Sequence, residues 1–265
     1  LRRARELFKK NGEREEAADC AKWQGRVLLR RGNQASAERF FLEAAADFSK
    51  LKSDLNQASA LYWAGVVQRQ QGKLDSALVA MTQAQALFAE YGDWEGVADC
   101  KLGCGLVWFY RGDLDQSESA QQEALRLHRR LHNDVGAADC LNGLAEVARY
   151  RGDLQGAEQN YRNAAAILSS VRASRAVLPQ VNLALILLQR GQDVAARQLL
   201  ETLSSAVERQ GKRALLGAVH VLFLVLVAQE KEAMSWARHF RKASSLLAET
   251  GAVDPDIAWA AQNSA

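Results

Sequence analysis

The sequence predicts an all-α fold in which helical hairpins stack side by side into a solenoid. Glycines recur at a nearly constant step, because Gly32, Gly72, Gly112, Gly152 and Gly191 are separated by 40, 40, 40 and 39 residues. Apolar residues between these glycines recur every three or four positions, which is the period of an α-helix. The chain also contains only 2 prolines and few β-branched runs, and this composition favours helices over strands.

Each unit of about 40 residues is expected to be a pair of helices, because a second break lies roughly halfway between the glycines. These breaks fall at Gly12, Lys52-Ser53-Asp54, Gly92-Asp93, His132-Asn133-Asp134, Gly211 and Gly251. A glycine ends a helix without steric penalty, and an Asp or Asn after it caps the next helix. Because one hairpin cannot bury its own apolar face, we expect neighbouring hairpins to share one core and form a single domain over residues 1–265.

The breaks set the expected boundaries of the repeats and of their first helices. The repeats are 13–52, 53–92, 93–132, 133–172, 173–211 and 212–251, with partial helices at 1–11 and 254–263. The first helices are expected near Arg14–Arg30, Asp54–Gln70, Asp93–Tyr110, Asn133–Tyr150, Leu178–Gln189 and Lys212–Gln229. Pro179 lies inside the fifth of these, so that helix should start late or kink.

We expect the solenoid to continue beyond both ends of the chain, because apolar residues lie there on helices that lack the other helix of their hairpin. We expect further repeats, another domain or a second copy of the chain to cover them. End-to-end self-association would use Leu7, Phe8, Ile257 and Trp259.

The fourth repeat resembles the tetratricopeptide repeat family. The matching residues, in order and spacing, are Leu141, Leu144, Ala145, Gly152-Asp153-Leu154, Ala157, Tyr161 and Ala164. The resemblance implies a right-handed superhelical solenoid of about six hairpins with partial flanking helices. The usual unit of that family is about 34 residues, so the longer unit resembles the long-helix subclass found in bacterial sensor and regulator proteins and in some eukaryotic polarity scaffolds.

The resemblance also implies that the first helix of each repeat lines a concave groove and contacts the partner. Transferred to this chain, the binding set is Lys22, Trp23, Arg26, Tyr62, Trp63, Arg69, Phe109, Tyr110, Asn142, Arg149 and Tyr150. Aromatic and arginine side chains combine a large contact area with directional donors, so they suit this role. The family's carboxylate clamp is not reproduced, because Arg26 and Glu146 stand one turn after Lys22 and Asn142.

One column of this face changes from tryptophan to glycine, at Trp23, Trp63, Gly103 and Gly143. Tryptophan has a large side chain and glycine has none, so this change predicts a recess at Gly103 and Gly143. The alternative is that the small residues only accommodate the close packing of curved helices.

No arrangement of residues in the sequence indicates catalysis, a metal site or a cofactor. Cys20, Cys100 and Cys140 share one repeat position and are expected to be buried in separate layers without a disulfide. His128 and His132 lack the glutamate of a zinc-protease motif. We therefore expect a protein that is not an enzyme.

The charge distribution points to the class of partner. A net charge of +3 is small for 265 residues and argues against a nucleic-acid partner. Residues 1–31 carry 10 basic and 5 acidic side chains, which favours an acidic partner. The apolar stretch at 218–228 is too short to span a membrane, and no leader opens the chain, so we expect a cytoplasmic protein without a membrane partner.

Two functions follow from these observations. The leading hypothesis is a protein–protein interaction scaffold that holds an acidic or aromatic peptide segment of a partner in its concave groove. The alternative is a small-molecule-sensing effector domain of a multidomain regulator, such as those of bacteria, with its ligand in the recess at Gly103 and Gly143.

Overall fold

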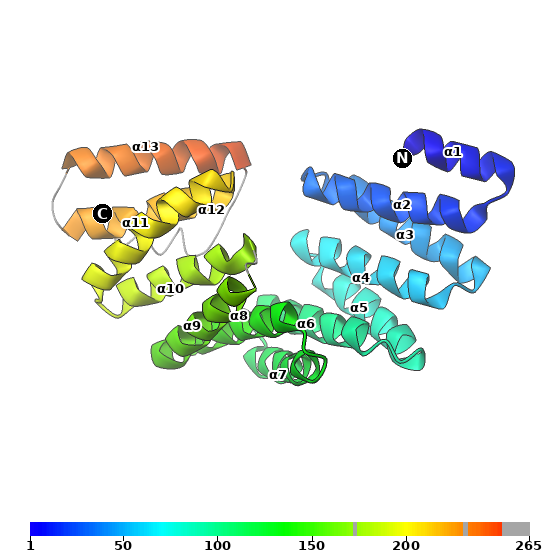
Figure 1. The fold of residues 1–265 in the computed structure, drawn as a ribbon, viewed down its shortest axis with the longest axis horizontal. Coiled ribbons are helices and arrows are strands. Elements are labelled where there is room, and N and C mark those ends of the chain that lie inside the picture. The colour runs from blue at the N-terminus through cyan, green and yellow to red at the C-terminus, as the bar shows by residue number, and fades with distance from the viewer. Residues whose placement is uncertain (172–173, 230–232, 251–265) are drawn as a thin grey trace. The chain divides into compact units, whose positions relative to one another are not determined.

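The computed structural model describes residues 1–171, 174–229 and 233–250, and every regular element in these ranges is a helix (Figure 1). The internal contacts divide the chain into two compact units, Leu1–Gly143 and Leu144–Ala265. Their boundary lies inside one continuous helix, Asp134–Tyr150. The all-α fold class is confirmed, and the single domain over 1–265 stays a prediction.

The first unit consists of helical hairpins that follow one another along the chain. Its helices are α1 (Arg2–Asn11), α2 (Arg14–Arg30), α3 (Gln34–Leu51), α4 (Asp54–Gln70), α5 (Leu74–Glu90), α6 (Trp94–Arg111), α7 (Leu114–Arg130) and the first part of α8 (Asp134–Tyr150). Each helix packs against the next, as in the pairs α2–α3, α3–α4, α4–α5 and α5–α6. The bounds of α2 and α4 are those expected from the sequence.

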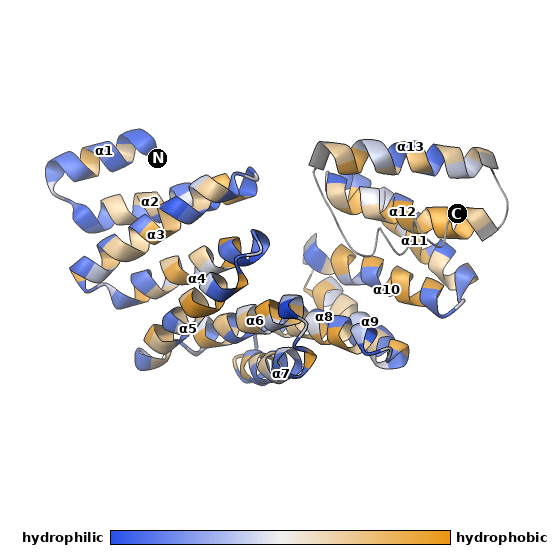
Figure 2. Cartoon of the chain, turned by 180° about the vertical axis from the view of Figure 1, so that it is seen from behind, coloured by the Kyte–Doolittle hydropathy of each residue, from blue (hydrophilic) through white to orange (hydrophobic). Residues whose placement is uncertain are grey.

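The second unit continues the same arrangement. It contains the rest of α8, α9 (Leu154–Ser170), the short 3-10 helix η1 (Ser174–Ala176), α10 (Val177–Gln189), α11 (Asp193–Arg209), α12 (Arg213–Gln229) and α13 (Ala233–Thr250). Its core is more aliphatic than that of the first unit, and Figure 2 shows long hydrophobic stretches on α10 and α12. The late start of α10 is confirmed, because Pro179 lies in its first turn, where a missing N–H costs little.

The turns between helices have the predicted chemistry. Gly112 adopts φ 81° and donates its N–H to Phe109 O, which ends α6 in the left-handed conformation. Asp113 then caps α7 by accepting from the backbone N–H of Gln116 at 3.0 Å. Lys52 takes the left-handed conformation at a break without glycine, with φ 56°.

Small residues permit the two helices of a hairpin to approach closely. A Cβ added at Gly65 would lie 2.8 Å from Met81 Cγ, and one at Gly25 would lie 2.8 Å from Phe41 Cε1. On the second helices, Ala77 is fully buried at the corresponding crossing. The van der Waals contact of backbone and side chain at these points therefore leaves no room for a larger residue.

The predicted recess at Gly103 and Gly143 is wrong, because long side chains from the second helices fill the space. A Cβ on Gly103 would lie 2.7 Å from Met81 Sδ, and a Cβ on Gly143 would lie 1.8 Å from Gln121 Oε1. Met81 and Gln121 are themselves fully buried. The glycines serve close helix packing, which was the alternative explanation.

The four cysteines are buried and form no disulfide, and burial raises the pKa of the Cys140 thiol to about 12. At the N-terminal end, α1 packs on α2, while Leu7 remains 53% exposed. Ile257 and Trp259 lie outside the described residues, together with the predicted helix 254–263. Self-association through the two ends therefore stays a prediction.

Two histidines that are distant in sequence meet in the second unit. His220 Nδ1 on α12 lies 3.0 Å from His239 Nδ1 on α13, and the His239 ring stacks on Phe223 with centroids 4.6 Å apart. Burial, and secondarily the neighbouring positive charges that include Arg238 and Lys242, lowers the pKa of both imidazoles to about 4. Both rings are therefore neutral near pH 7.

We expect Gly96→Ala to destabilise the first unit, because the added Cβ would lie 2.5 Å from Cγ of Phe88. Overpacking of this kind costs about 1–3 kcal/mol, which exceeds the helix-propensity gain of about 1 kcal/mol from replacing glycine. Urea denaturation should show a lower free energy of unfolding. In the Phe88→Leu background the same substitution should cost much less, and an equal cost in both backgrounds would contradict the packing explanation.

We expect acid to destabilise the second unit between about pH 6.5 and pH 4. The folded pKa of each paired histidine is depressed, so in this window the unfolded chain binds more protons than the folded chain, and stability falls as the pH falls. Thermal denaturation at pH 7, 5.5 and 4.5 should show a smaller loss of Tm for His239→Gln than for the unmodified chain. Equal losses would show that the histidine pair does not contribute.

Candidate functional site

The predicted binding residues lie on the first helix of each hairpin, nine of them in the first unit and two in the second. In the first unit α2 contacts α4, and α4 contacts α6, so these helices form one continuous wall. Trp23 is 49% exposed and Tyr110 is 60% exposed on it. Aromatic side chains exposed to this extent offer a large contact area to a partner.

Arg26 lies between two tryptophans. Its guanidinium carbon is 4.5 Å from the ring centroid of Trp23 and 5.1 Å from that of Trp63. Tyr62 and Phe41 contact Trp63 in turn, with ring centroids 5.5 and 6.2 Å away. These two cation–π contacts restrict the Arg26 guanidinium, whose N–H groups are donors suited to a ligand. We name Trp23, Arg26 and Trp63 the Arg26 cluster.

A second cation–π contact joins α4 to α6. The Arg69 guanidinium lies 5.6 Å from the centroid of the Tyr110 ring, and Phe109 contacts Tyr110 edge to face at 5.7 Å. Lys22, in contrast, is committed to neighbours, because its ammonium pairs with Asp19 at 2.8 Å and donates to Asn56 Oδ1 at 3.0 Å. Lys22 therefore positions side chains of α2 and α4.

Arg149 and Tyr150 belong to the second unit. Arg149 pairs with Glu146 at 2.7 Å, and its side chain is only 12% exposed. The Glu146 carboxylate also accepts from Asn182 Nδ2 at 3.1 Å and from the buried Tyr161 hydroxyl. Arg149 is thus part of an internal network, and Tyr150, 51% exposed above its guanidinium, is the accessible member of the pair. Asn142, on α8, is half-buried and makes contacts of its own.

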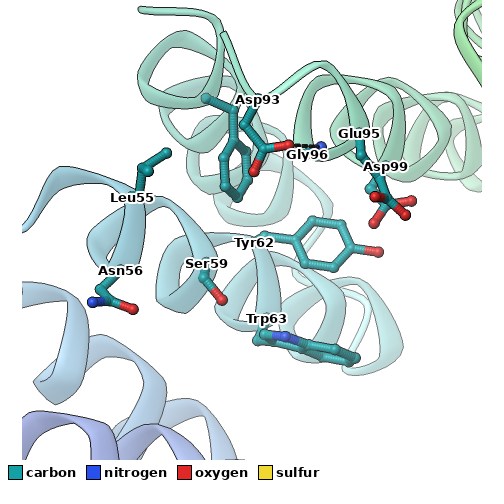
Figure 3. A pocket seen from close by; sticks show the side chains of 10 residues that line it. Leu55, Asn56, Ser59, Tyr62, Trp63, Asp93, Glu95, Gly96 and Asp99 are labelled. Carbon is teal, nitrogen blue, oxygen red and sulfur yellow. Dashed lines mark hydrogen bonds between the residues drawn. The ribbon is translucent and has the colours of Figure 1, made fainter. Parts of the chain in front are cut away.

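A pocket of about 330 Å³ opens between α4 and α6 (Figure 3), and Trp63 belongs both to its lining and to the Arg26 cluster. Tyr62 and Trp63 come from α4, and three carboxylates face them from the start of α6. The lining residues are Leu55, Asn56, Ser59, Tyr62, Trp63, Phe88, Asp93, Glu95, Gly96 and Asp99. This set includes no lysine or arginine, so its net charge is negative.

Hydrogen bonds hold two of the three carboxylates of this pocket in place. Asp93 caps α6 by accepting from the Gly96 N–H at 2.9 Å, and Glu95 accepts from Asn133 Nδ2 at 2.8 Å. Asp99 lies 3.6 Å from Nε2 of the fully buried His128 and keeps 44% of its side chain exposed. Burial, and secondarily the negative charge of Asp99, raises the pKa of the Tyr62 phenol, which therefore stays protonated.

The arrangement suits the binding of a positively charged group. Aromatic faces attract cations through their quadrupole, and carboxylates add charge and hydrogen-bond acceptors. Within the described ranges there is no group of three or more His, Cys, Asp or Glu residues placed to hold a metal ion. None of the helices described is long and apolar enough to cross a membrane.

The acidic side of the pocket was missed from the sequence, although a signal was present. Asp99 belongs to the Ala-Asp-Cys motif that recurs with Asp19 and Asp139, and Ser59 takes its place in the second repeat. Asp93 lies at the predicted break after Gly92, where an Asp was expected to cap the next helix, and it fills that role.

Comparison with known proteins places the chain among helical-repeat proteins. Residues 105–170 match the family model described as tetratricopeptide repeat. A comparison with curated proteins gives no significant match. The Rap protein complexed with competence and sporulation factor is similar in fold, with a TM-score of 0.77 and 15% identity over 89% of this chain. The chain spans 66% of the length of that protein.

Two other solved structures have the same fold. The Rap conjugation gene regulator of plasmid pLS20, in complex with a Phr peptide, gives a TM-score of 0.74 at 15% identity and covers 93% of this chain and 79% of its own. Aspartyl phosphate phosphatase F from Bacillus subtilis gives 0.70 at 12% identity and covers 91% and 73%. Identities this low establish a common fold and nothing further.

We expect Arg149→Ala to destabilise the second unit, because it leaves Glu146 with a largely buried charge and fewer donors. Loss of a hydrogen-bonded charged partner costs about 1.5–3 kcal/mol. The matched control is Arg162→Ala, whose ion pair with Glu158 is 52% exposed on the arginine side and should contribute less than about 1 kcal/mol. Urea denaturation measures both, and equal losses would contradict the internal role of Arg149.

The fold and the family model agree with the resemblance found in the repeats. Residues 105–170 match the family in sequence, and the described helices share the hairpin fold of its structural relatives. The chain therefore has the helical-repeat fold of these neighbours, and its residues 105–170 are similar to the tetratricopeptide repeat family.

Proposed function

We propose that the chain is a protein-interaction scaffold that binds a peptide segment of a partner on the wall formed by α2, α4 and α6. The observation that carries this proposal is the Arg26 cluster lying directly beside a pocket of about 330 Å³, since both include Trp63. Aromatic and arginine anchors next to a cavity are the usual centre of a protein-binding surface. Apart from Phe88 of α5, the residues of the Arg26 cluster and of the pocket lie on the first helices or at the start of α6.

The structural neighbours support a peptide as the ligand. Two of them were solved with bound partners, one with competence and sporulation factor and one with a Phr peptide. Those ligands belong to the neighbours. For this chain, the support is that the same fold presents exposed aromatic side chains on its first helices.

The chemistry of the wall defines the peptide. The rings of Trp23 and Tyr110 suit an aromatic residue, and the edge of the Arg26 guanidinium suits a carboxylate. The pocket lined by Asp99 suits the opposite charge, so we propose a segment that also carries one lysine or arginine. The basic N-terminal region contributes less to an acidic partner than its charge count suggests, because Arg5 and Lys9 both pair with Glu43.

The structure leaves no space for a ligand at the position that the small-molecule alternative requires. Met81 and Gln121 occupy the volume at Gly103 and Gly143 where the ligand was expected. One neighbour is named as a phosphatase, but 12% identity transfers no activity to this chain. The binding wall is built from aromatic, arginine and carboxylate side chains whose geometry suits recognition, and we assign it no catalytic step.

Selection from a random heptapeptide library on the immobilised chain tests the proposal. Enriched peptides should share an aromatic residue and a lysine or arginine at a fixed spacing. For one such peptide, Arg26→Ala, Tyr110→Ala and Asp99→Asn should each weaken Kd about tenfold or more, which corresponds to about 1.4 kcal/mol. Isothermal titration calorimetry measures these constants.

The matched control is Gln122→Ala on the second helix α7, where the side chain is exposed away from this wall. It should leave Kd unchanged. The proposed site would be contradicted if substitution of Arg26, Tyr110 and Asp99 left the peptide affinity unchanged. It would also be contradicted if the selected peptides shared no common pattern.

A further inference from the structure

A second cavity, of about 290 Å³, lies in the second unit, where the end of α11 and the start of α12 meet α13. It is lined by Glu208, Gly211, Lys212, Arg213, Leu216, His220, Lys242 and Leu246. None of these residues belongs to the peptide-binding wall proposed for the first unit. The cavity is therefore an independent feature of the molecule.

The lining of this cavity is strongly basic. Lys212, Arg213 and Lys242 come from two different helical segments and face a single carboxylate, Glu208. Lys212 is half-buried, and burial together with the nearby charge of Arg175 lowers its pKa. Cations that accumulate around one enclosed volume repel one another, so an anion in that volume is favoured.

The start of α12 strengthens this positive field. The first turn of α12, like that of α10, carries no acidic residue, whereas those of α2, α4, α6 and α8 do and so offset the positive end of the helix dipole. Lys212 stands immediately before α12, and an ammonium group has no acceptor with which to cap the helix. The helix dipole and the side-chain charges therefore add.

The other lining residues limit what the anion can be. Leu216 and Leu246 provide an apolar wall, and His220, only 4% exposed, is held by His239 at 3.0 Å. Two ammonium groups and one guanidinium match the charge and the several acceptor oxygens of a phosphate monoester. An apolar wall beside them accommodates a small organic group.

We propose that this cavity binds a small molecule bearing a phosphate group. Lys212 and Lys242 supply point charges, Arg213 supplies a fork of N–H donors, and the leucines contact the organic part of the ligand. The site is independent of the peptide-binding wall, so either proposal can fail without the other. It also gives the small-molecule alternative a position that the glycine column does not provide.

The probes are inorganic phosphate and free phosphoserine, added to the full 265-residue chain, with sodium chloride at equal ionic strength as the reference. Both phosphates should raise Tm well above the chloride sample, because a ligand that binds only the folded state stabilises it. Calorimetry should show that phosphoserine binds at least as tightly as inorganic phosphate. An equal effect of chloride would overturn the proposal, because it would show general screening of charge.

Lys242→Glu and Arg213→Gln test the position, since both side chains are exposed at the cavity and their replacement should leave the fold intact. Each should weaken phosphate binding about tenfold or more. The matched control is Lys50→Glu on α3, whose side chain is 77% exposed, and it should bind as the unmodified chain does. Unchanged binding in both cavity variants would overturn the proposal, as would tighter binding of a phosphoserine hexapeptide than of free phosphoserine, which would indicate a protein partner.

Discussion

The structure depends on one steric constraint, which is the close approach of the two helices within each hairpin. Gly25 and Gly65 lie against Phe41 and Met81 at distances that leave no space for a side chain. Because the backbones pack this tightly, the apolar side chains of the second helices reach across to the neighbouring repeat. The wall of first helices, with the Arg26 cluster and the acidic pocket on it, is carried by this packing.

The sequence predicted the fold well because the relevant signals are local. A left-handed break, a capping carboxylate and a three-to-four-residue apolar period act within one helix, so the bounds of α2 and α4 follow from them directly. Pro179 likewise determined the late start of α10 through its missing N–H. The fold of a repeat protein is also easier to predict, because the same pattern of helices and turns occurs in each unit.

The candidate site was predicted only in part, because its properties arise between helices. The sequence identified Trp23, Arg26 and Trp63, but their stacking needs α2 and α4 side by side. It placed a recess at Gly103 and could not show that Met81 would fill it. Arg149 was predicted to contact a partner, and only the meeting of α8, α9 and α10 shows that Tyr161 and Asn182 join its pair with Glu146 in an internal network.

The order of charges along the wall of the first unit has a consequence for recognition. The Arg26 guanidinium lies between α2 and α4, whereas the carboxylates of the pocket lie at the start of α6. A segment that crosses this wall meets a cation first and anions second, so the two ends of the segment are not equivalent. A segment bound in the reverse direction would bring like charges together. The wall would therefore distinguish the chain direction of its ligand as well as its composition.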